Sequence, residues 1–262
     1  MRSFSFALAY WILSIGYASA AAFAALTPGR GATSWIIRRY VKRMVQAMRI
    51  FAGIKIEVRG RERLPTGAFI IASKHQSWGD GFAVYDQFED LAFVTGDHLE
   101  KFPLLGTVLR KLGAIVVNSC GGREARDALK HRAADAHASG RKILIYPEGH
   151  LAKVGEKFRY RAGVWHMYRD FDMPVVPLAS NMGLFWPQEE FRKNPGTATL
   201  EFLDPIPTGL GKDEFLARLE AAVEDCTAEL IAEATGKPVT PAVQVPTPDE
   251  VAKTKKAANA SA

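Results

Sequence analysis

The segment AFIIASKHQSWGDGFAVYDQF, residues 68–88, decides the fold of this chain. Its first five residues, Ala68–Ala72, are apolar and rich in isoleucine, which predicts a short buried strand. A polar loop follows, and the pattern then predicts a helix over Gly81–Phe88. A strand that runs through a polar loop into a helix is typical of α/β proteins, and such sheets usually present their chemistry at the carboxyl end of the strand.

The same alternation continues on both sides of this segment. Short runs rich in Ile and Val predict further strands at Ile54–Val58, Leu91–Val94, Ala114–Val117, Lys142–Tyr146, Val175–Ala179 and Thr197–Phe202. Further helices are predicted at Leu104–Leu112, Glu124–Ala138, Gly163–Phe171 and Lys212–Ala234. We therefore predict an α/β domain over residues 53–235, with a mixed, largely parallel sheet covered by helices.

Composition excludes several classes of protein. The chain has 262 residues, of which 48% are hydrophobic and 24% charged, as in globular proteins with a sizeable core and unlike disordered or collagen-like chains. The two cysteines, Cys120 and Cys226, lie far apart without metal or redox spacing, which favours a reducing compartment. Residues 236–262 are rich in Pro, Ala, Thr and Lys and lack aromatic residues, which predicts a disordered tail.

The N-terminus is strongly hydrophobic. No charged residue occurs between Ser3 and Gly29, and a helix over Phe4–Leu26 would be ~34 Å long, against ~30 Å for the hydrocarbon core of a bilayer. A cleavable signal peptide is one alternative, because Ala18-Ser19-Ala20 resembles a cleavage site, and a buried globular helix is another. We favour a membrane anchor, because the apolar run exceeds the ~7–15 residues of a signal core.

A cationic amphipathic helix is predicted over Trp35–Phe51. Apolar residues share one face of this helix, and basic residues lie largely elsewhere around its axis. The apolar face comprises Ile36, Tyr40, Met44, Met48 and Phe51. We predict that residues 1–52 form a two-helix anchor on an anionic membrane surface. The alternative is a solvated basic helix packed on the domain.

Charge is concentrated in this N-terminal part. Residues 1–60 contain nine Lys and Arg against one acid, Glu57, which is a net charge of +8, whereas the whole chain carries +6. The body is therefore slightly acidic, and no nucleic-acid partner is expected. By the positive-inside tendency the basic flank places the body on the cytoplasmic face of the cell (inner) membrane.

A candidate general base, His75, lies in the loop that follows the predicted strand Ala68–Ala72. His75 precedes Asp80 by five residues, a spacing that lets the carboxylate accept a hydrogen bond from one imidazole nitrogen while the other takes a proton. The alternative is a histidine whose hydrogen bonds are simply satisfied in a loop.

Two other segments carry weaker signals. Ile145–His150 (IYPEGH) runs from a strand into a glycine turn, where Glu148 can bind a ligand hydroxyl or structure the loop, and Gly149 permits a positive φ or a close backbone approach. Met173–Leu178 is an apolar strand that contains prolines, and it is either an edge strand or a buried one.

Together these segments resemble the lysophosphatidic acid acyltransferase family of glycerolipid acyltransferases. The resemblance covers roughly residues 50–210 and rests on four ordered blocks. These are KHQSWGD (Lys74–Asp80), FPLLG (Phe102–Gly106), IYPEGH (Ile145–His150) and MPVVPLASNMGLFWP (Met173–Pro187).

The resemblance implies an acyltransferase. It implies that an acyl group passes from acyl-CoA or acyl carrier protein to the 2-hydroxyl of lysophosphatidic acid, giving phosphatidic acid, without a metal or other cofactor. His75 is then the general base and Asp80 orients it. The implied substrate-binding residues are Glu148, Gly149, His150, Lys101 and Ser77. The implied acyl-contacting or structural residues are Pro103, Gly106, Pro147, Val176 and Pro177.

The chain departs from the family at three cationic positions, which Gly96, Ser119 and Leu151 occupy. An Arg–phosphate contact is a strong charge-assisted bond, so this loss bears on the acceptor. Candidates for a replacement are Lys101, Arg123, Lys153, Arg159, Arg161 and a protonated His150. A different lysolipid acceptor is therefore an alternative. A hydrolase or thioesterase that uses His75 with Ser77 or Cys120, and a non-catalytic lipid carrier, are further alternatives.

Overall fold

The core of the molecule is a mixed seven-stranded sheet. The structure is a computed structural model, and it describes residues 1–117, 123–252 and 254. Across the sheet the strands are β1 (Ile54–Arg59), β8 (Gly196–Phe202), β7 (Val175–Ser180), β2 (Ile70–Ser73), β5 (Lys142–Ile145), β3 (Leu91–Gly96) and β4 (Ile115–Val117). The five strands from β7 to β4 are parallel, and β8 joins β7 in antiparallel register. The prediction of a mixed, largely parallel sheet is confirmed.

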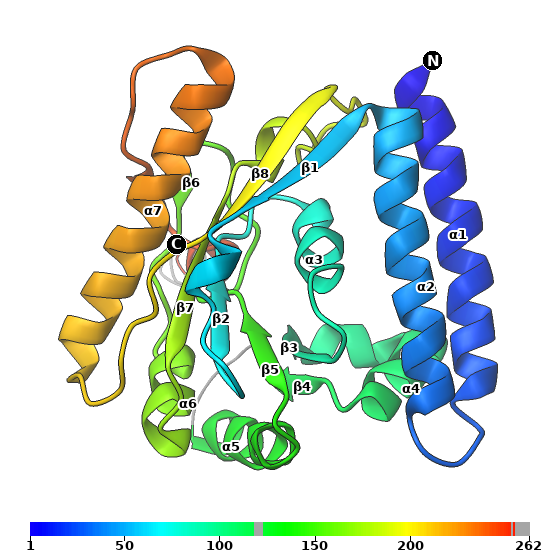
Figure 1. Cartoon of the computed structure of the whole chain (residues 1–262), viewed down its shortest axis with the longest axis horizontal. Helices are drawn as coiled ribbons and strands as arrows, with labels where there is room; N and C mark the ends of the chain where they lie inside the picture. The colour runs from blue at the N-terminus through cyan, green and yellow to red at the C-terminus, as the bar shows by residue number, and fades with distance from the viewer. Residues whose placement is uncertain (118–122, 253, 255–262) are drawn as a thin grey trace, which may run out of the picture.

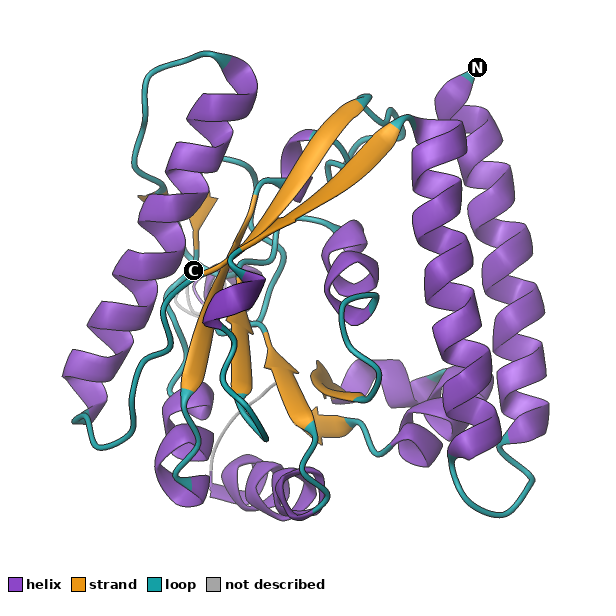
Figure 2. Ribbon diagram, viewed as in Figure 1, coloured by secondary structure: helices purple, strands orange, loops and turns teal. Residues whose placement is uncertain are grey.

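Helices cover both faces of this sheet (Figures 1 and 2). They are α1 (Arg2–Ala24), α2 (Gly31–Ala47), α3 (Trp78–Tyr85), α4 (Pro103–Leu112), α5 (Arg123–Ala138), α6 (Gly163–Phe171) and α7 (Lys212–Thr235). A π-helical turn, Met48–Ala52, extends α2. Side chains alternate along each strand, so Ile71 packs toward α1, α2 and α3, whereas Ile70 and Ala72 pack toward α5, α6 and α7.

The two N-terminal helices lie side by side at one end of the molecule (Figure 1). The apolar face of α2 differs in part from the prediction, because Met44 and Met48 are fully buried in the core rather than free for lipid. The helix α1 is 23 residues long and is the one helix of the described residues that is long and apolar enough to cross a membrane. Its exposed large apolar residues are Phe4, Leu8, Trp11, Ile12, Ile15 and Phe23.

Part of the predicted tail is ordered. The strand β9 (Val243–Gln244) pairs in parallel with β6 (Glu156–Lys157), and the Val245 N–H donates to the Lys157 carbonyl at 3.0 Å. Backbone groups of these residues find partners in the loop that follows β5, and disorder of the tail as a whole stays a prediction. Residues 253 and 255–262 of the predicted tail lie outside the described residues.

Candidate active site

The predicted base lies where three neighbouring parallel strands end. Ala72 of β2 is in register with Pro177 of β7 on one side and with Ile145 of β5 on the other. The loops that follow β2, β5 and β7 therefore leave the same edge of the sheet. His75 comes from the first of these loops, Tyr146 to His150 from the second, and Ser180 ends the third strand.

His75 and Asp80 are in contact. The His75 Nδ1 lies 3.3 Å from Oδ2 of Asp80, whose side chain is fully buried while that of His75 is 19% exposed. The same Oδ2 accepts the backbone N–H groups of Gln76 and Ser77, each at 2.8 Å. The other oxygen, Oδ1, accepts the Ser180 hydroxyl at 3.0 Å. Because these donors come from two strand ends, the carboxylate is fixed in one orientation toward the imidazole.

The local sequence explains why Asp80 points back toward His75. Ser77 is the N-cap of α3: its Oγ accepts the Gly79 N–H at 2.9 Å, and Asp80, at the third helical position, accepts the Ser77 N–H in return. This capping box starts α3 at Trp78, earlier than the predicted Gly81. The expected contact of Ser77 with substrate does not fit, because its side chain is fully buried in this cap.

Tyr146 is a site residue that the sequence analysis did not single out. Its ring stacks on the His75 imidazole with a centroid separation of 3.8 Å and an interplanar angle of 16°. Its hydroxyl is buried and has no hydrogen-bond partner among the described residues. Burial, followed by the charge of Asp80, raises the pKa of this phenol well above its ordinary value. The signal was an aromatic residue directly before the Pro-Glu-Gly turn, but sequence spacing does not indicate stacking.

Glu148 belongs to a buried charge cluster rather than to an open binding surface. The Lys74 ammonium lies 3.1 Å from the Glu148 carboxylate and 2.9 Å from that of Glu224 on α7. Glu148 also accepts the Phe158 N–H at 2.9 Å, and Tyr160 donates to Glu224 at 2.9 Å. Burial, opposed by Lys74, raises the pKa of Glu148 to about 7. These contacts favour the loop-structuring alternative for Glu148, and its contact with substrate stays a prediction.

The turn after Glu148 holds an arginine close to the backbone. Gly149 has φ +71°, and a Cβ built there would lie 2.9 Å from Nε of Arg161, so this turn requires glycine. The Arg161 Nη2 lies 2.8 Å from His150 Nε2. Burial and then the Arg161 charge lower the pKa of His150, whereas Asp249 acts in the opposite direction. Arg161, whose side chain is 42% exposed, remains available as a replacement cation.

Comparison with known proteins agrees with this geometry. A family model described as "Acyltransferase" matches residues 55–181, which include His75, Asp80 and Glu148. The 1-acyl-sn-glycerol-3-phosphate acyltransferase of Pseudomonas aeruginosa is 29% identical over 212 residues, which cover 79% of this chain and 82% of that protein. The chain is therefore similar to 1-acyl-sn-glycerol-3-phosphate acyltransferases, and the acyltransferase family model matches just under half of it.

Other 1-acyl-sn-glycerol-3-phosphate acyltransferases match over different extents. The chloroplastic 1-acyl-sn-glycerol-3-phosphate acyltransferase BAT2 of Brassica napus is 22% identical over 141 residues, and the match spans 41% of its length. Among solved structures, the 1-acyl-sn-glycerophosphate acyltransferase PlsC of Thermotoga maritima has a TM-score of 0.70 at 19% identity, over 88% of this chain and 95% of that one. This structural likeness establishes a shared fold.

The second family block lies around the start of α4. A Cβ at Gly106 would lie 2.5 Å from the Glu100 carbonyl oxygen, so a larger residue at this position would require the backbone to shift. Pro103 is the first residue of α4, where a proline fits because no helical N–H partner is needed there. Lys101 is exposed at the end of the preceding 3-10 turn, Asp97–Lys101, and no described contact ties it to His75.

The fourth block forms an interior strand of the sheet. Val176 and Pro177 are buried in β7, between β2 and β8, which settles the choice between an edge strand and a buried one. The Pro177 carbonyl accepts the Leu203 N–H at 3.0 Å, and the β7–β8 ladder begins only at Leu178. The missing N–H of Pro177 therefore falls outside this ladder. Pro147 is likewise buried, and its carbonyl accepts the Arg161 N–H at 2.8 Å.

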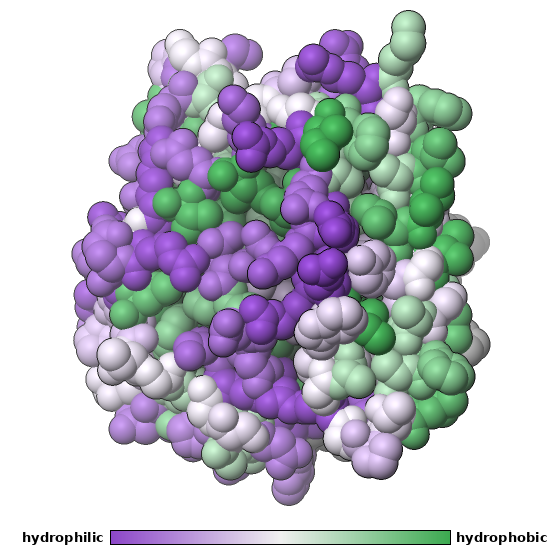
Figure 3. Space-filling view, turned by 45° about the vertical axis from the view of Figure 1, so that its right-hand side comes forward, coloured by the Kyte–Doolittle hydropathy of each residue, from purple (hydrophilic) through white to green (hydrophobic). Residues whose placement is uncertain are grey.

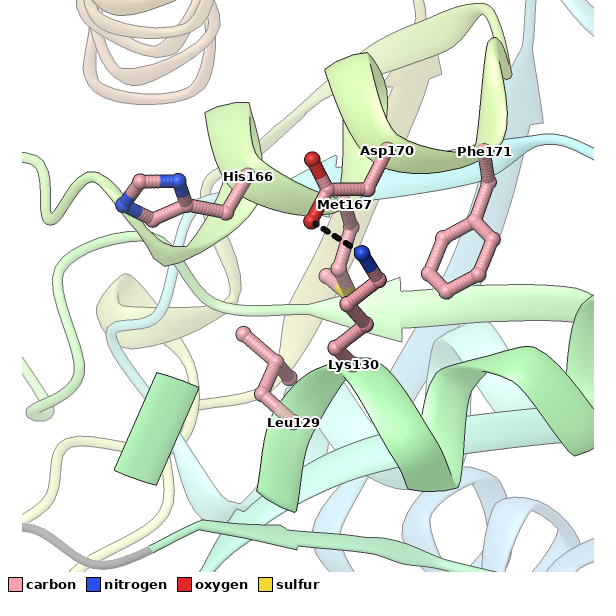
Figure 4. A pocket seen from close by; sticks show the side chains of 6 residues that line it. All are labelled: Leu129, Lys130, His166, Met167, Asp170 and Phe171. Carbon is pink, nitrogen blue, oxygen red and sulfur yellow. Dashed lines mark ion pairs between the residues drawn. The ribbon is translucent and has the colours of Figure 1, made fainter. Parts of the chain in front are cut away.

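The remaining described candidate cations, Lys153 and Arg159, lie on the loop that follows β5. Lys153 pairs with Glu189 at 2.9 Å, and Arg159 is exposed. The positions of Ser119 and Cys120, and the side chain of Arg123, lie outside the described residues. A shallow depression between α5 and α6, crossed by an ion pair of 3.8 Å between Lys130 and Asp170, contains none of the residues of the four blocks (Figure 4).

Proposed function

We propose that this chain transfers a fatty acyl group from acyl-CoA or acyl carrier protein to the 2-hydroxyl of lysophosphatidic acid, forming phosphatidic acid for phospholipid synthesis. The observation that carries the proposal is the contact of His75 with the buried Asp80 at the end of β2, within the part of the chain that the family model matches.

The geometry supports direct transfer with His75 as the general base. If Nδ1–H donates to Asp80, Nε2 is the nitrogen that takes the proton of the acceptor hydroxyl. The hydroxyl oxygen attacks the thioester carbonyl, and the resulting tetrahedral intermediate expels the thiolate, which receives the proton from the imidazolium. A thioester needs no metal for this step, because positioning, a base and oxyanion stabilisation are enough.

The hydrolase alternative requires a nucleophile beside His75. Ser77 does not fit this role, because its hydroxyl is buried and accepts a hydrogen bond in the cap of α3. Cys120, the other nucleophile of this alternative, lies outside the described residues. The reaction that we propose proceeds without an acyl-enzyme intermediate. An acyl probe that labelled the chain covalently would contradict it.

The proposed acceptor is a membrane lipid, and the N-terminal helices are suited to meet it. We place α1, together with the basic surface of α2, at the cytoplasmic face of the inner membrane. Support comes from the exposed apolar residues of α1, which form a hydrophobic strip on the right-hand side of Figure 3, and from the excess of Lys and Arg in residues 1–60.

Substitution of the two proposed catalytic residues tests this function. We expect His75→Ala and Asp80→Asn each to lower turnover with lysophosphatidic acid by about 10²-fold to 10⁴-fold, the usual contribution of a positioned base. His131→Ala, which changes an exposed histidine on α5, is the matched control and keeps full activity. Full activity of both site variants would rule out the proposed base.

A second candidate keeps the reaction and changes the acceptor. It is favoured by the absence of cations at Gly96 and Leu151, where the family pattern has them. A panel of lysophospholipids and lyso-aminolipids assayed side by side separates the two candidates. Uncharged or zwitterionic acceptors that outperform lysophosphatidic acid by tenfold or more would favour this second candidate.

A further inference from the structure

The C-terminal segment returns to the turn that follows β5. After β9 pairs with β6, Thr247 caps a helical turn: its N–H donates to Glu250 Oε2 at 2.7 Å, and its hydroxyl donates to the same oxygen at 2.9 Å. Thr247 is buried, with 7% of its surface exposed, whereas Glu250 is exposed. Residues 243–252, which we name the C-terminal strap, are thus held against the loop by specific backbone contacts.

The carboxylate of Asp249, in the strap, lies close to Arg161, the cation beside the Gly149 turn. Asp249 Oδ2 lies 3.6 Å from Nη2 of Arg161 and 3.4 Å from Nε2 of His150. Both partners remain partly open to solvent, with the side chain of Asp249 53% exposed and that of Arg161 42% exposed. An ion pair of this kind is weak, because water screens it.

The strap is not closely packed on the body. An open groove of about 540 Å³ is lined by apolar residues of the strap and by Glu156 and Phe158 of the loop. Apart from Val245 and Thr247, the residues of the strap are exposed, so the strap loses few buried contacts when it lifts. The carboxylate of Asp249 is therefore held on Arg161 by a short, displaceable segment.

We propose that Asp249 occupies on Arg161 the position of the acceptor's anionic phosphate, so that the C-terminal strap and the acceptor head group compete for this guanidinium. The inference rests on the proposed function and extends it by assigning the head-group cation. Arg161 lies against the turn at Gly149. This turn belongs to the loop that follows β5, and the first residue of that loop, Tyr146, stacks on His75. A guanidinium pairs with carboxylate or phosphate through the same fork of donors, and a phosphate monoester carries more charge.

The test compares full-length variants with two acceptors, lysophosphatidic acid and an uncharged monoacylglycerol. We expect Asp249→Asn to lower KM for lysophosphatidic acid about threefold to tenfold, with kcat unchanged, and to leave KM for monoacylglycerol unchanged. We expect Arg161→Gln to raise KM for lysophosphatidic acid at least tenfold. In the Arg161→Gln background, Asp249→Asn should have no further effect. Asp225→Asn, which removes an exposed charge from α7, is the matched control.

Three results would overturn the inference. They are an unchanged KM in Asp249→Asn, an equal change for both acceptors, and a lowered KM that persists in the Arg161→Gln background. Binding of glycerol 3-phosphate to the same variants, measured by calorimetry, gives a readout that needs no turnover. If the wild type binds glycerol 3-phosphate through Arg161 but acylates no lysophospholipid, the proposed function fails and the head-group site stands. If it acylates lysophosphatidic acid and the variants match it, only the strap inference fails.

Discussion

At the scale of single residues, His75 is held by two contacts of different kinds. Asp80 holds its Nδ1 edge at 3.3 Å, and the Tyr146 ring covers one face at a centroid separation of 3.8 Å. A hydrogen bond at one nitrogen leaves the imidazole free to swing about that bond, and a stacked ring removes this freedom. We therefore expect the ring of Tyr146, rather than its buried hydroxyl, to position the proposed base.

Substitutions at Tyr146 separate the ring from the hydroxyl. Tyr146→Leu is expected to lower kcat by about tenfold to 100-fold, because misplacing a reacting group by a fraction of an ångström is enough for losses of that order. Tyr146→Phe keeps the stack and should retain most of the activity. Steady-state kinetics check both variants, and KM should change little in either. A loss in Tyr146→Phe as large as in Tyr146→Leu would assign the effect to the hydroxyl.

At the scale of elements, the buried cluster joins segments that are far apart in the chain. Lys74 follows β2, Glu148 follows β5, and Glu224 lies on α7. Removing one partner from a buried ion pair leaves an uncompensated charge, which typically costs about 3–5 kcal/mol. The cluster therefore connects α7 to both loops of the candidate site, although α7 supplies no residue to the His75–Asp80 pair.

This cluster predicts a pH-dependent stability. Because the pKa of Glu148 is raised from 4.5 to about 7 in the fold, the folded chain binds a proton that the unfolded chain releases. The stabilisation from this proton is fully present below pH 4.5 and is lost as the pH rises through 7. We expect the free energy of unfolding of the wild type to fall between pH 5 and pH 8, relative to Glu148→Gln, by an amount on the order of 3 kcal/mol.

Denaturant unfolding in detergent, followed by circular dichroism across this range, measures the difference. Glu62→Gln, which changes an exposed carboxyl, is the control and should follow the wild type at every pH. A constant difference between wild type and Glu148→Gln would mean that Glu148 stays ionised throughout and pairs with Lys74 as a full charge.

Elements governed by local patterns were predictable, and those governed by distant partners were not. The helix α6 (Gly163–Phe171) lies where the sequence predicted it, and β1 and β8 differ from prediction by one residue at one end. By contrast, β6 and β9 are two-residue strands that form only because residues 156–157 and 243–244 meet in space. The burial of Met44 on α2 likewise depends on the domain packed against it. An amphipathic pattern does not say whether protein or lipid covers its apolar face.

The candidate site also combines features that follow from local sequence with features that depend on distant residues. The spacing of His75 and Asp80 permitted their contact, and the family resemblance favoured it, whereas the capping box that turns Asp80 toward His75 was found only in the structure. Glu148 was placed at the right turn, but its burial depends on Lys74 and Glu224, which are 74 and 76 residues away in sequence. A buried ion pair between such distant residues has no local sequence signal.

At the scale of the whole molecule, apolar and basic surfaces lie together at one end. The exposed apolar residues of α1 and the exposed Trp35 of α2 belong to the pair of helices at the right-hand side of Figure 1. Four of the basic residues of the first 60 positions, Arg38, Arg39, Lys42 and Arg43, lie on α2, whereas Arg59 of β1 pairs with Glu233 on α7. Apolar burial gives such a surface its affinity for a bilayer, and basic residues add an attraction to anionic lipid that salt weakens.

Vesicle binding tests this orientation through Trp11 and Ile15, whose side chains are 61% and 64% exposed on α1. Burying two such residues in lipid contributes roughly 2–4 kcal/mol, so the double variant Trp11→Asp, Ile15→Asp should bind vesicles about 30-fold to 1000-fold more weakly. Co-sedimentation with zwitterionic and anionic vesicles measures the loss, and higher salt should weaken only the anionic component. Val239→Asp, an exposed apolar residue beyond α7, is the control. Equal binding of the double variant and this control would contradict the proposed membrane face of α1.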